Sequence, residues 1–495
     1  MPDRLTARQL IELALDDGSF ASWDTPPLRE GAEAPDEAYA AQLARASARS
    51  GVDEAVVTGR GRLDGHDVAV LVGEFAFLAG SIGRATARRI RAAIARATAE
   101  GVPLLAAPVS GGTRMQEGVP AFVQMAPIAA ALAEHRAAGF PYLVWLRHPT
   151  TGGVMASWGS LGQITAAEPD ALIGFLGPRV FEALHGEDFP SGVQTGENLA
   201  DHGVIDCVVP AADLRTAAAR VLGLLQERVR PNEGTPRHSG VEPRIPADED
   251  ATWSVIRRSR AADHPGVRDL LAHAGEETVL LGGTGEGERD PGVLLALTRL
   301  GGRSCVVVGH DREAQAAHGP FGPAGLRTAR RGVRLAGELR LPLVTVVDTG
   351  GAELSKAAEE GAMAGEIART LASLMTSPVP TVSVLLGQGN GGGALALLPA
   401  DRVVATDAGW LSPLPPEGAS VIVHRDTEHA ASMAHAQGVT AAAMAATGLV
   451  DVLLPRGEAP RETVGLVGSV VGEQLALLAG MAPGVRLAAR TQRYG

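Results

Sequence analysis

Cysteine is scarce in this chain of 495 residues, which contains only Cys207 and Cys305. Two cysteines so far apart exclude a disulfide framework and a C-x-x-C zinc ribbon, and they suit a reducing compartment. A dense basic run is also missing, and 44 Lys and Arg residues against 56 Asp and Glu residues leave a formal charge of −12. We therefore expect no nucleic-acid-binding surface, although local arginines and backbone amides can still hold an anionic ligand.

The chain also lacks the apolar segments that targeting and membrane insertion require. Residues 1–20 alternate apolar and charged side chains and do not form the uninterrupted apolar core of a signal peptide. No stretch approaches the roughly 18 apolar residues needed to span a bilayer. The sequence therefore predicts a cytoplasmic protein with no membrane partner.

The familiar signatures of side-chain catalysis are missing as well. The sequence contains no Walker lysine loop, no G-x-S-x-G elbow and no H-E-x-x-H zinc motif. His424, His429 and His435 are not spaced for a shared metal site on one helix, so we interpret them as surface or structural histidines. We expect no zinc and no other metal cofactor.

Glycine is the residue in excess. The chain contains 62 glycines, where average usage is about 7% of residues. They cluster at the ends of apolar, strand-like runs, where a ligand-binding backbone often needs them.

An internal duplication is visible along the chain. The segment PLLAAPVSGG at 103–112 returns as PLVTVVDTGG at 342–351, and GVIDCVVP at 203–210 returns as GLVDVLLP at 448–455. Two shorter matches accompany them, from Gly83 to Gly325 and from 152–156 to 392–396. Four matches in the same order, each about 240 residues apart, indicate two copies of one fold.

The duplication and the chain length both predict two domains. Residues 227–250 are rich in Pro, Gly and charge, which is typical of a linker. We therefore predict an N-terminal domain at 1–230, a linker at 231–250 and a C-terminal domain at 251–495. In each half, short apolar runs bounded by Gly, Pro or Asp alternate with helical stretches, which favours an α/β fold with a largely parallel sheet.

Two glycine-rich loops follow predicted strands in each half. They are Ser110–Thr113 and Thr150–Val154 in the first half, and Thr349–Ala352 and Gly389–Ala394 in the second. A strand that ends in glycines and opens a helix exposes free backbone N–H groups, and the helix dipole adds positive charge there. Such donors suit a thioester oxygen that becomes negative as an enolate forms, and losing one donor typically costs about 3–4 kcal/mol.

At these loops the sequence resembles a known family, the acetyl-CoA carboxylase carboxyltransferases. The first half resembles their β subunit through SGGTRMQEG at 110–118, PTTGGVMASWGSLG at 149–162 and AEPDALIGFLGPRV at 167–180. The second half resembles their α subunit through LPLVTVVDTGGAE at 341–353 and GQGNGGGALAL at 387–397. This resemblance implies two tandem crotonase-like (ClpP/crotonase) domains.

The resemblance also implies a site and a reaction. Acyl-CoA would bind to the first half and biotin to the second, with oxyanion donors at Gly111 and Gly112 and at Gly393 and Ala394. The surrounding binding residues would be Ser110, Thr113, Gly152, Gly153, Val154, Gly350, Gly351 and Gly392. Carboxybiotin would release CO2, the biotin anion would take the α-proton of the thioester, and the enolate would attack CO2. In that family the active site lies between protomers, which implies a homo-oligomer.

The chain departs from the family in places. It has no four-cysteine zinc ribbon, and Gly350, Gln388 and Asn390 stand where a proline, a glutamate and a serine are expected. It also has no Met-Lys-Met biotin-attachment motif and no ATP-grasp module. A carboxyltransferase of this kind would need a separate biotin carboxylase and biotin carboxyl carrier.

The resemblance favours a carboxyltransferase that makes malonyl-CoA or a homologue, as in fatty acid biosynthesis. The same loops would also serve a malonate or malonyl-thioester decarboxylase, which forms the same enolate from the opposite direction. A non-catalytic assembly subunit that has kept the fold is the third interpretation, and the departures in the second half motivate it.

Overall fold

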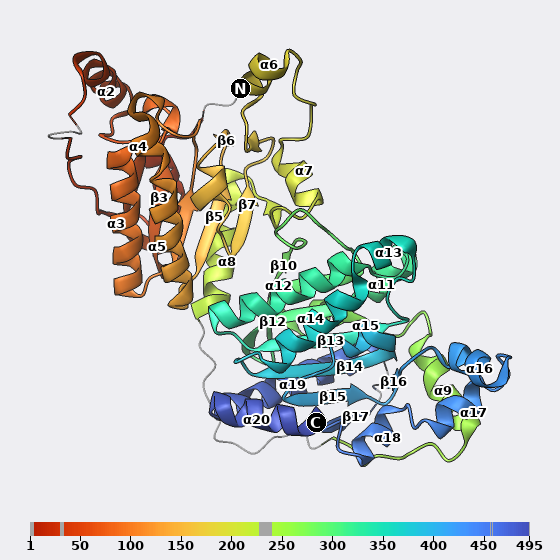
Figure 1. The fold of residues 1–495 in the computed structure, drawn as a ribbon. Coiled ribbons are helices and arrows are strands. Elements are labelled where there is room, and N and C mark those ends of the chain that lie inside the picture. Colours follow the sequence, from red (N-terminus) through yellow and green to blue (C-terminus); the bar gives the residue numbers. More distant parts are fainter. Residues whose placement is uncertain (1–3, 30–33, 227–239, 456, 458, 495) are drawn as a thin grey trace. The chain divides into compact units, whose positions relative to one another are not determined.

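A computed structural model describes residues 4–29, 34–226, 240–455, 457 and 459–494. The chain forms two compact units, Met1–Gly223 and Leu224–Gly495 (Figure 1). Residues 227–239, which include residues 231–239 of the predicted linker, lie outside the described residues. Within 240–248 the chain is irregular, and the Val241 amide donates to the Leu453 carbonyl of the second unit at 2.8 Å.

The first unit is built on a seven-stranded sheet in the order β1-β2-β3-β4-β5-β7-β9. Its strands are β1 (Ala21–Ser22), β2 (Val56–Leu63), β3 (His66–Gly73), β4 (Leu104–Ala107), β5 (Tyr142–Leu146), β7 (Ile164–Ala167) and β9 (Cys207–Val208). The first three pair antiparallel and the rest pair parallel. The short strands β6 (Thr150–Thr151) and β8 (Ile173–Gly174) form a separate parallel pair. Because β3, β4 and β5 run in parallel, the loops that follow them meet at one edge of the sheet.

The helices of the first unit cover this sheet. They are α1 (Ala7–Ala14), α2 (Glu37–Ser50), α3 (Arg84–Glu100), α4 (Gly118–Phe122), α5 (Met125–Ala137), α6 (Pro178–His185), α7 (Gly196–Asp201) and α8 (Leu214–Gln226), with short helical turns η2 (Leu78–Gly80), η3 (Met115–Glu117), η4 (Met155–Gly159) and η5 (Ala211–Asp213). On the inner face of helix α3, Ile90 and Ile94 are fully buried. They pack with Leu71 and Leu104 of the sheet and Leu132 of α5 in one core.

The second unit repeats this plan on an eight-stranded sheet. The main path is β10 (Gly275–Leu281), β11 (Val293–Leu300), β12 (Arg303–His310), β13 (Leu343–Thr349), β14 (Thr381–Asn390), β15 (Arg402–Thr406) and β17 (Val452–Leu454), and β16 (Trp410–Ser412) pairs with the end of β14. Again the first three strands pair antiparallel and the rest pair parallel. Five of the seven strand pairings described in this sheet are parallel, so the sheet is largely parallel, as the sequence predicts.

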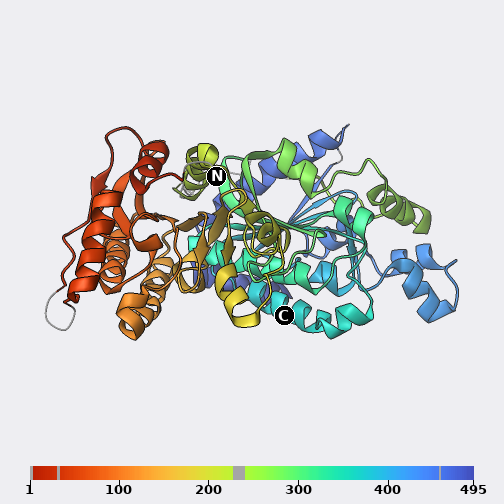
Figure 2. The same ribbon diagram turned by 90° about the horizontal axis from the view of Figure 1, so that it is seen from above.

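Helices cover both faces of the second sheet (Figures 1 and 2). They are α9 (Glu249–Ser259), α10 (Val267–His273), α11 (Arg312–His318), α12 (Pro323–Leu339), α13 (Lys356–Glu360), α14 (Met363–Met375), α15 (Gly391–Leu395), α16 (Pro416–His424), α17 (Ala430–Ala436), α18 (Ala441–Ala446), α19 (Pro460–Ala479) and α20 (Pro483–Tyr494). Helix α12 approaches Val306 and Val308 of β12 through Gly332, whereas α19 shares a core cluster with Val307. Alternate residues of a strand point to opposite faces, so α12 and α19 cover opposite sides.

Helix α19 corrects one expectation from the sequence. Within the described residues it is the one helix long and apolar enough to cross a membrane by length and composition. In the structure 61% of the most apolar 18-residue stretch of this helix is buried. Val464, Val467 and Leu475 are fully buried in the core of the second unit, so the apolar composition of α19 reflects core packing.

Candidate active site

The two glycine loops of the first unit meet at the carboxyl ends of β4 and β5. The Ser110 amide donates to the Pro149 carbonyl at 2.8 Å, and the Thr151 amide donates to the Ser110 carbonyl at 3.0 Å. A Cβ atom added at Gly152 would lie 3.2 Å from the Gly112 Cα atom. The loops therefore approach backbone to backbone, and the structure brings together the residues predicted for the acyl-CoA side: Ser110, Gly111, Gly112, Thr113, Gly152, Gly153 and Val154.

The amides of this loop pair differ in whether they are already used. The Gly111 amide donates to the Ala79 carbonyl at 2.9 Å, and the Gly112 amide donates to Ser110 Oγ at 2.9 Å. Among the described residues, neither the Thr113 amide nor the Gly153 amide has an acceptor. A Cβ atom at Gly153 would lie 3.1 Å from Thr113 Oγ1, so these two residues are close neighbours. The role of Gly111 and Gly112 as donors stays a prediction, and Thr113 and Gly153 offer the free N–H groups.

The second unit repeats the turn in which Gly112 takes part. The Gly351 amide donates to Thr349 Oγ1 at 3.1 Å, as the Gly112 amide donates to Ser110 Oγ. Gly112 and Gly351 both have positive φ, at +112° and +126°, a conformation that favours glycine. The matched contact in both units supports the duplication that the sequence indicates.

The second unit's loops also meet closely. A Cβ atom at Gly393 would lie 3.3 Å from the Ala352 amide nitrogen and 2.7 Å from the Phe321 ring. Gly391 opens helix α15 behind its N-cap residue, Asn390. In an α-helix the N-cap carbonyl accepts from the residue four positions later, here Ala394, and the amides before it stay free. Of the predicted biotin-side residues, Gly350, Gly351, Gly392, Gly393 and Ala394 thus lie in adjoining loops, and Gly392 and Gly393 offer free amides.

A buried polar cluster lies beneath these loops. Asp348, at the end of β13, is fully buried; its Oδ1 accepts from the Gln388 amide at 2.9 Å and its Oδ2 pairs with Arg312 at 3.1 Å. Burial raises the pKa of Asp348 to about 6, although Arg312 and the Gln388 amide act in the opposite direction. His310 is also fully buried, and burial lowers its pKa to about 3, so this imidazole is neutral. No separate signal in the sequence indicates this cluster, because Asp348 stands out there only as part of the glycine motif.

The raised pKa of Asp348 predicts a pH dependence of stability. The folded state binds this proton more tightly than the unfolded state does, whose aspartate pKa is 3.8, so the stabilising contribution is complete below about pH 4 and disappears as the pH rises through 6. Relative to an Asp348→Asn variant, we expect the unaltered protein to lose on the order of 3 kcal/mol of unfolding free energy between pH 4 and 7. Denaturant unfolding of both proteins across this range measures the difference, and parallel pH profiles would contradict it.

The histidines considered in the sequence lie elsewhere in the second unit. His429 Nδ1 pairs with Asp426 at 2.8 Å, its ring stacks on His424, and both histidines are exposed. His435 Nδ1 shares a hydrogen bond of 3.0 Å with Thr252 Oγ1. Over the described ranges, no three His, Cys, Asp or Glu side chains gather in a group that could hold a metal ion.

Comparison with known proteins gives a consistent result. The family model of the carboxyl transferase domain matches residues 2–454. A Mycobacterium tuberculosis protein named probable biotin-dependent acyl-coenzyme A carboxylase beta3 subunit is 53% identical over 99% of this chain and 98% of its own length. A Parafrankia protein named acetyl-coenzyme A carboxylase carboxyl transferase subunits beta/alpha is 35% identical over 99% of this chain and 86% of its own length.

Two solved structures share the fold. The transcarboxylase 12S structure, described as a hexamer assembly with methylmalonyl-coenzyme A and methylmalonic acid bound, has a TM-score of 0.75 at 22% identity over 95% of this chain and 90% of that chain. A single-chain, multi-domain long-chain acyl-CoA carboxylase has a TM-score of 0.70 at 18% identity over 94% of this chain and 46% of that chain. At such low identity the similarity concerns the fold alone, and it confirms the predicted tandem crotonase-like architecture.

Proposed function

We propose, because this chain belongs to the carboxyl transferase domain family, that it is the carboxyltransferase subunit of a biotin-dependent acyl-CoA carboxylase. Membership of this family identifies the chain as a transferase enzyme. The finer part of the proposal is the product, malonyl-CoA or a homologue with a short acyl group. The relatives are named for acyl-CoA and for acetyl-CoA, and both names fit this range of substrates.

The observation that carries the proposal is the pair of unused amides at Thr113 and Gly153. Both lie at the carboxyl edge of the sheet on loops that are fixed by backbone hydrogen bonds. A thioester oxygen placed between them would receive two N–H donors as its negative charge develops. Each such donor is worth about 3–4 kcal/mol of transition-state stabilisation, and the site needs no catalytic side chain for this step.

The second unit's loops fit the ureido group of biotin. The amides of Ala352, Gly392 and Gly393 are neutral donors suited to an oxygen that gains charge, and the neutral His310 adds no competing charge. Any side chain at Gly393 would meet Phe321 and Ala352, so the backbone there must stay bare. Biotin, when bound, supplies the carboxyl group and a basic nitrogen for the α-proton, while the chain supplies orientation and oxyanion donors.

We propose partners and a location to match. The chain would work with a separate biotin carboxylase and a biotin carboxyl carrier, as an oligomer of identical copies, in the cytoplasm. The solved transcarboxylase relative, described as a hexamer, supports an oligomer. The names of the curated relatives support the dependence on biotin.

The reverse reaction tests this function with the purified chain alone. We expect free biotin to accelerate CO2 release from malonyl-CoA or methylmalonyl-CoA, with no release from either substrate when biotin is left out. The ratio of kcat/KM values between the two substrates ranks the acyl groups. Release from a malonyl-carrier thioester without biotin would favour the decarboxylase, and a folded protein inactive with every substrate would favour an assembly subunit.

A further inference from the structure

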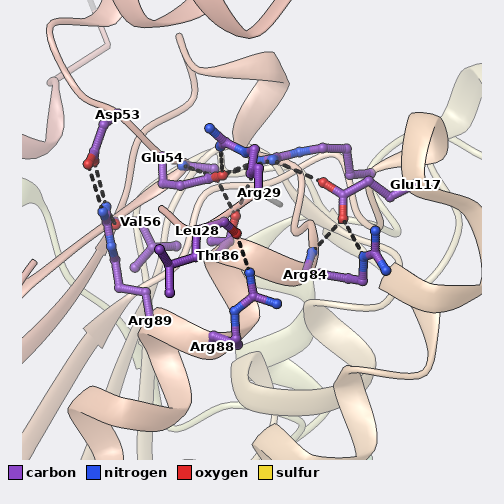
Figure 3. Close-up of polar contacts among 12 residues, drawn as sticks. Leu28, Arg29, Asp53, Glu54, Val56, Arg84, Thr86, Arg88, Arg89 and Glu117 are labelled. Atoms are coloured by element: carbon purple, nitrogen blue, oxygen red, sulfur yellow. Dashed lines mark hydrogen bonds and ion pairs between the residues drawn. The ribbon is translucent and has the colours of Figure 1, made fainter. Parts of the chain in front are cut away.

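A buried ion pair lies directly behind the proposed acyl-CoA loop. Arg114 follows Thr113 in the sequence, and its guanidinium is fully buried against the fully buried carboxylate of Glu54. Arg114 Nη2 lies 2.9 Å from Glu54 Oε2, and Nη1 lies 3.2 Å from Glu54 Oε1. Thr86 Oγ1 donates to Glu54 Oε2 at 2.6 Å, and Arg29 also pairs with Glu54 (Figure 3). Two buried charges are thus paired in a bidentate arrangement with further hydrogen bonds.

Arg114 holds the loop through a second segment of the chain, residues 79–82. Its Nη2 donates to the Ser81 carbonyl at 2.8 Å, and its backbone amide donates to the Ile82 carbonyl at 3.0 Å. The Ile82 amide in turn donates to the Gly112 carbonyl at 3.0 Å. These bonds fix the residues on both sides of Thr113, so the direction of the Thr113 N–H depends on them.

The pair stays charged over the pH range of ordinary assays. Burial alone would raise the pKa of Glu54, but Arg114, Thr86 and Arg29 outweigh it and hold that pKa at about 2. Because the Arg114 side chain is fully buried, it does not contact substrate; it acts through the groups that it holds, which are the Ser81 carbonyl and the Glu54 and Glu117 carboxylates.

The second unit shows that the fold itself does not require this pair. At the matching loop position stands Glu353, whose backbone amide donates to the Phe321 carbonyl at 2.9 Å just as Arg114 N donates to Ile82. The Glu353 carboxylate accepts from Ser355 Oγ at 2.6 Å. The same backbone turn therefore forms in the second unit without an arginine at this position.

A different buried arginine does recur in both units. Arg89 on α3 is nearly fully buried and pairs with Asp53 at 2.8 Å (Figure 3). Its counterpart Arg331 on α12 donates to the Gly282 carbonyl at 2.8 Å. An arginine at the same position in both units indicates a role in the fold that the two units share. Arg114 is present only in the first unit, which indicates a role specific to the loop of that unit.

We propose that Arg114, held by Glu54, is a positioning residue that aims the Thr113 N–H at the thioester oxygen of the acyl-CoA substrate. This inference rests on the proposed function. It predicts an effect on the chemical step and little effect on substrate binding, because the oxyanion forms only on the way to the transition state.

The test compares Arg114→Lys with Arg89→Lys in the biotin-dependent decarboxylation assay. Lysine keeps the charge but not the planar fork, so it cannot hold Glu54 and the Ser81 carbonyl together. We expect kcat of Arg114→Lys to fall about 10- to 100-fold with KM for the CoA substrate changed less than about threefold. Arg89→Lys should lower the melting temperature about as much as Arg114→Lys does, but it should leave kcat within about twofold of the value for the unaltered protein.

A second variant covers the possibility that Arg114→Lys does not fold. Glu54→Gln keeps the shape of the carboxylate and removes its charge, and it should show the same kcat loss at unchanged KM. In the double variant the two losses should not add, because both changes break one unit. If kcat of Arg114→Lys or of Glu54→Gln is no lower than kcat of Arg89→Lys, the positioning role is overturned and the proposed function is not affected. An unaltered protein with no activity would overturn the proposed function, and the positioning role with it.

Discussion

Replacing Gly152 by alanine is expected to lower biotin-dependent turnover about 10-fold. Gly152 has φ of +65°, which is strained for any residue with a side chain, and the new Cβ atom would lie 3.2 Å from the Gly112 Cα atom. The clash is between backbones, so no flexible side chain can relieve it. The two loops must separate by a few tenths of an ångström. Because a displacement of about 1 Å in a catalytic group typically costs about 10²-fold in rate, we expect a loss of about 10-fold. The measurement is kcat and KM for the decarboxylation of malonyl-CoA.

Gly65→Ala is the matched control for this effect. Gly65 also has positive φ, at +80°, but a Cβ atom there would meet nothing within 4 Å. It lies in the turn between β2 and β3, at the start of β3, whereas the glycine loops follow the ends of the parallel strands. The control shares the backbone strain and leaves the loops alone, so we expect reduced stability with normal kcat. Equal kcat values in the two variants would contradict the role of the close loop contact.

Much of the fold could be predicted from sequence because its signals are local. The apolar runs at 103–109, 304–309 and 342–348 lie on β4, β12 and β13, since β-branched residues bounded by Gly or Pro favour short buried strands. Strands β1, β2 and β3 of the first sheet and β10 and β11 of the second were missed. Strand β2 contains TGRGRL, whose glycines and arginines break the apolar pattern, although Asp64-Gly65 is a typical hairpin turn.

The site shows where sequence reasoning ends. The glycine loops could be located, because positive φ and close backbone approach leave glycine as the residue of choice. Which amides are free could not be predicted. The Gly111 amide is used by the Ala79 carbonyl, and the segment 79–82 reaches this loop only through tertiary packing. The pairing of Arg114 with Glu54, 60 residues away, was hidden for the same reason.

Asp401→Ala is expected to cause the largest loss of stability, about 3–5 kcal/mol in the second unit. Asp401 Oδ1 lies 2.8 Å from Nη2 and 3.0 Å from Nε of Arg490 on helix α20, and the Arg490 side chain is fully buried. Asp401 Oδ2 also accepts from the Thr381 amide at 2.8 Å, at the start of β14. Removing the carboxylate leaves a buried guanidinium without its counter-charge and an amide without its acceptor.

The loss should appear first where α20 docks. Arg490 also donates to the Ser377 carbonyl at 3.0 Å, which ties α20 to the chain between α14 and β14. When the Arg490 side chain is no longer held by Asp401, this contact should weaken and α20 should detach more easily. Hydrogen exchange should therefore speed up across α20 before it does in β13, whose strand is buried throughout. Glu360→Ala breaks the Lys356–Glu360 pair, whose side chains are 85% and 67% exposed, and it should change neither exchange nor the melting temperature measurably. If Asp401→Ala is no more damaging than Glu360→Ala, the pair with Arg490 does not anchor α20.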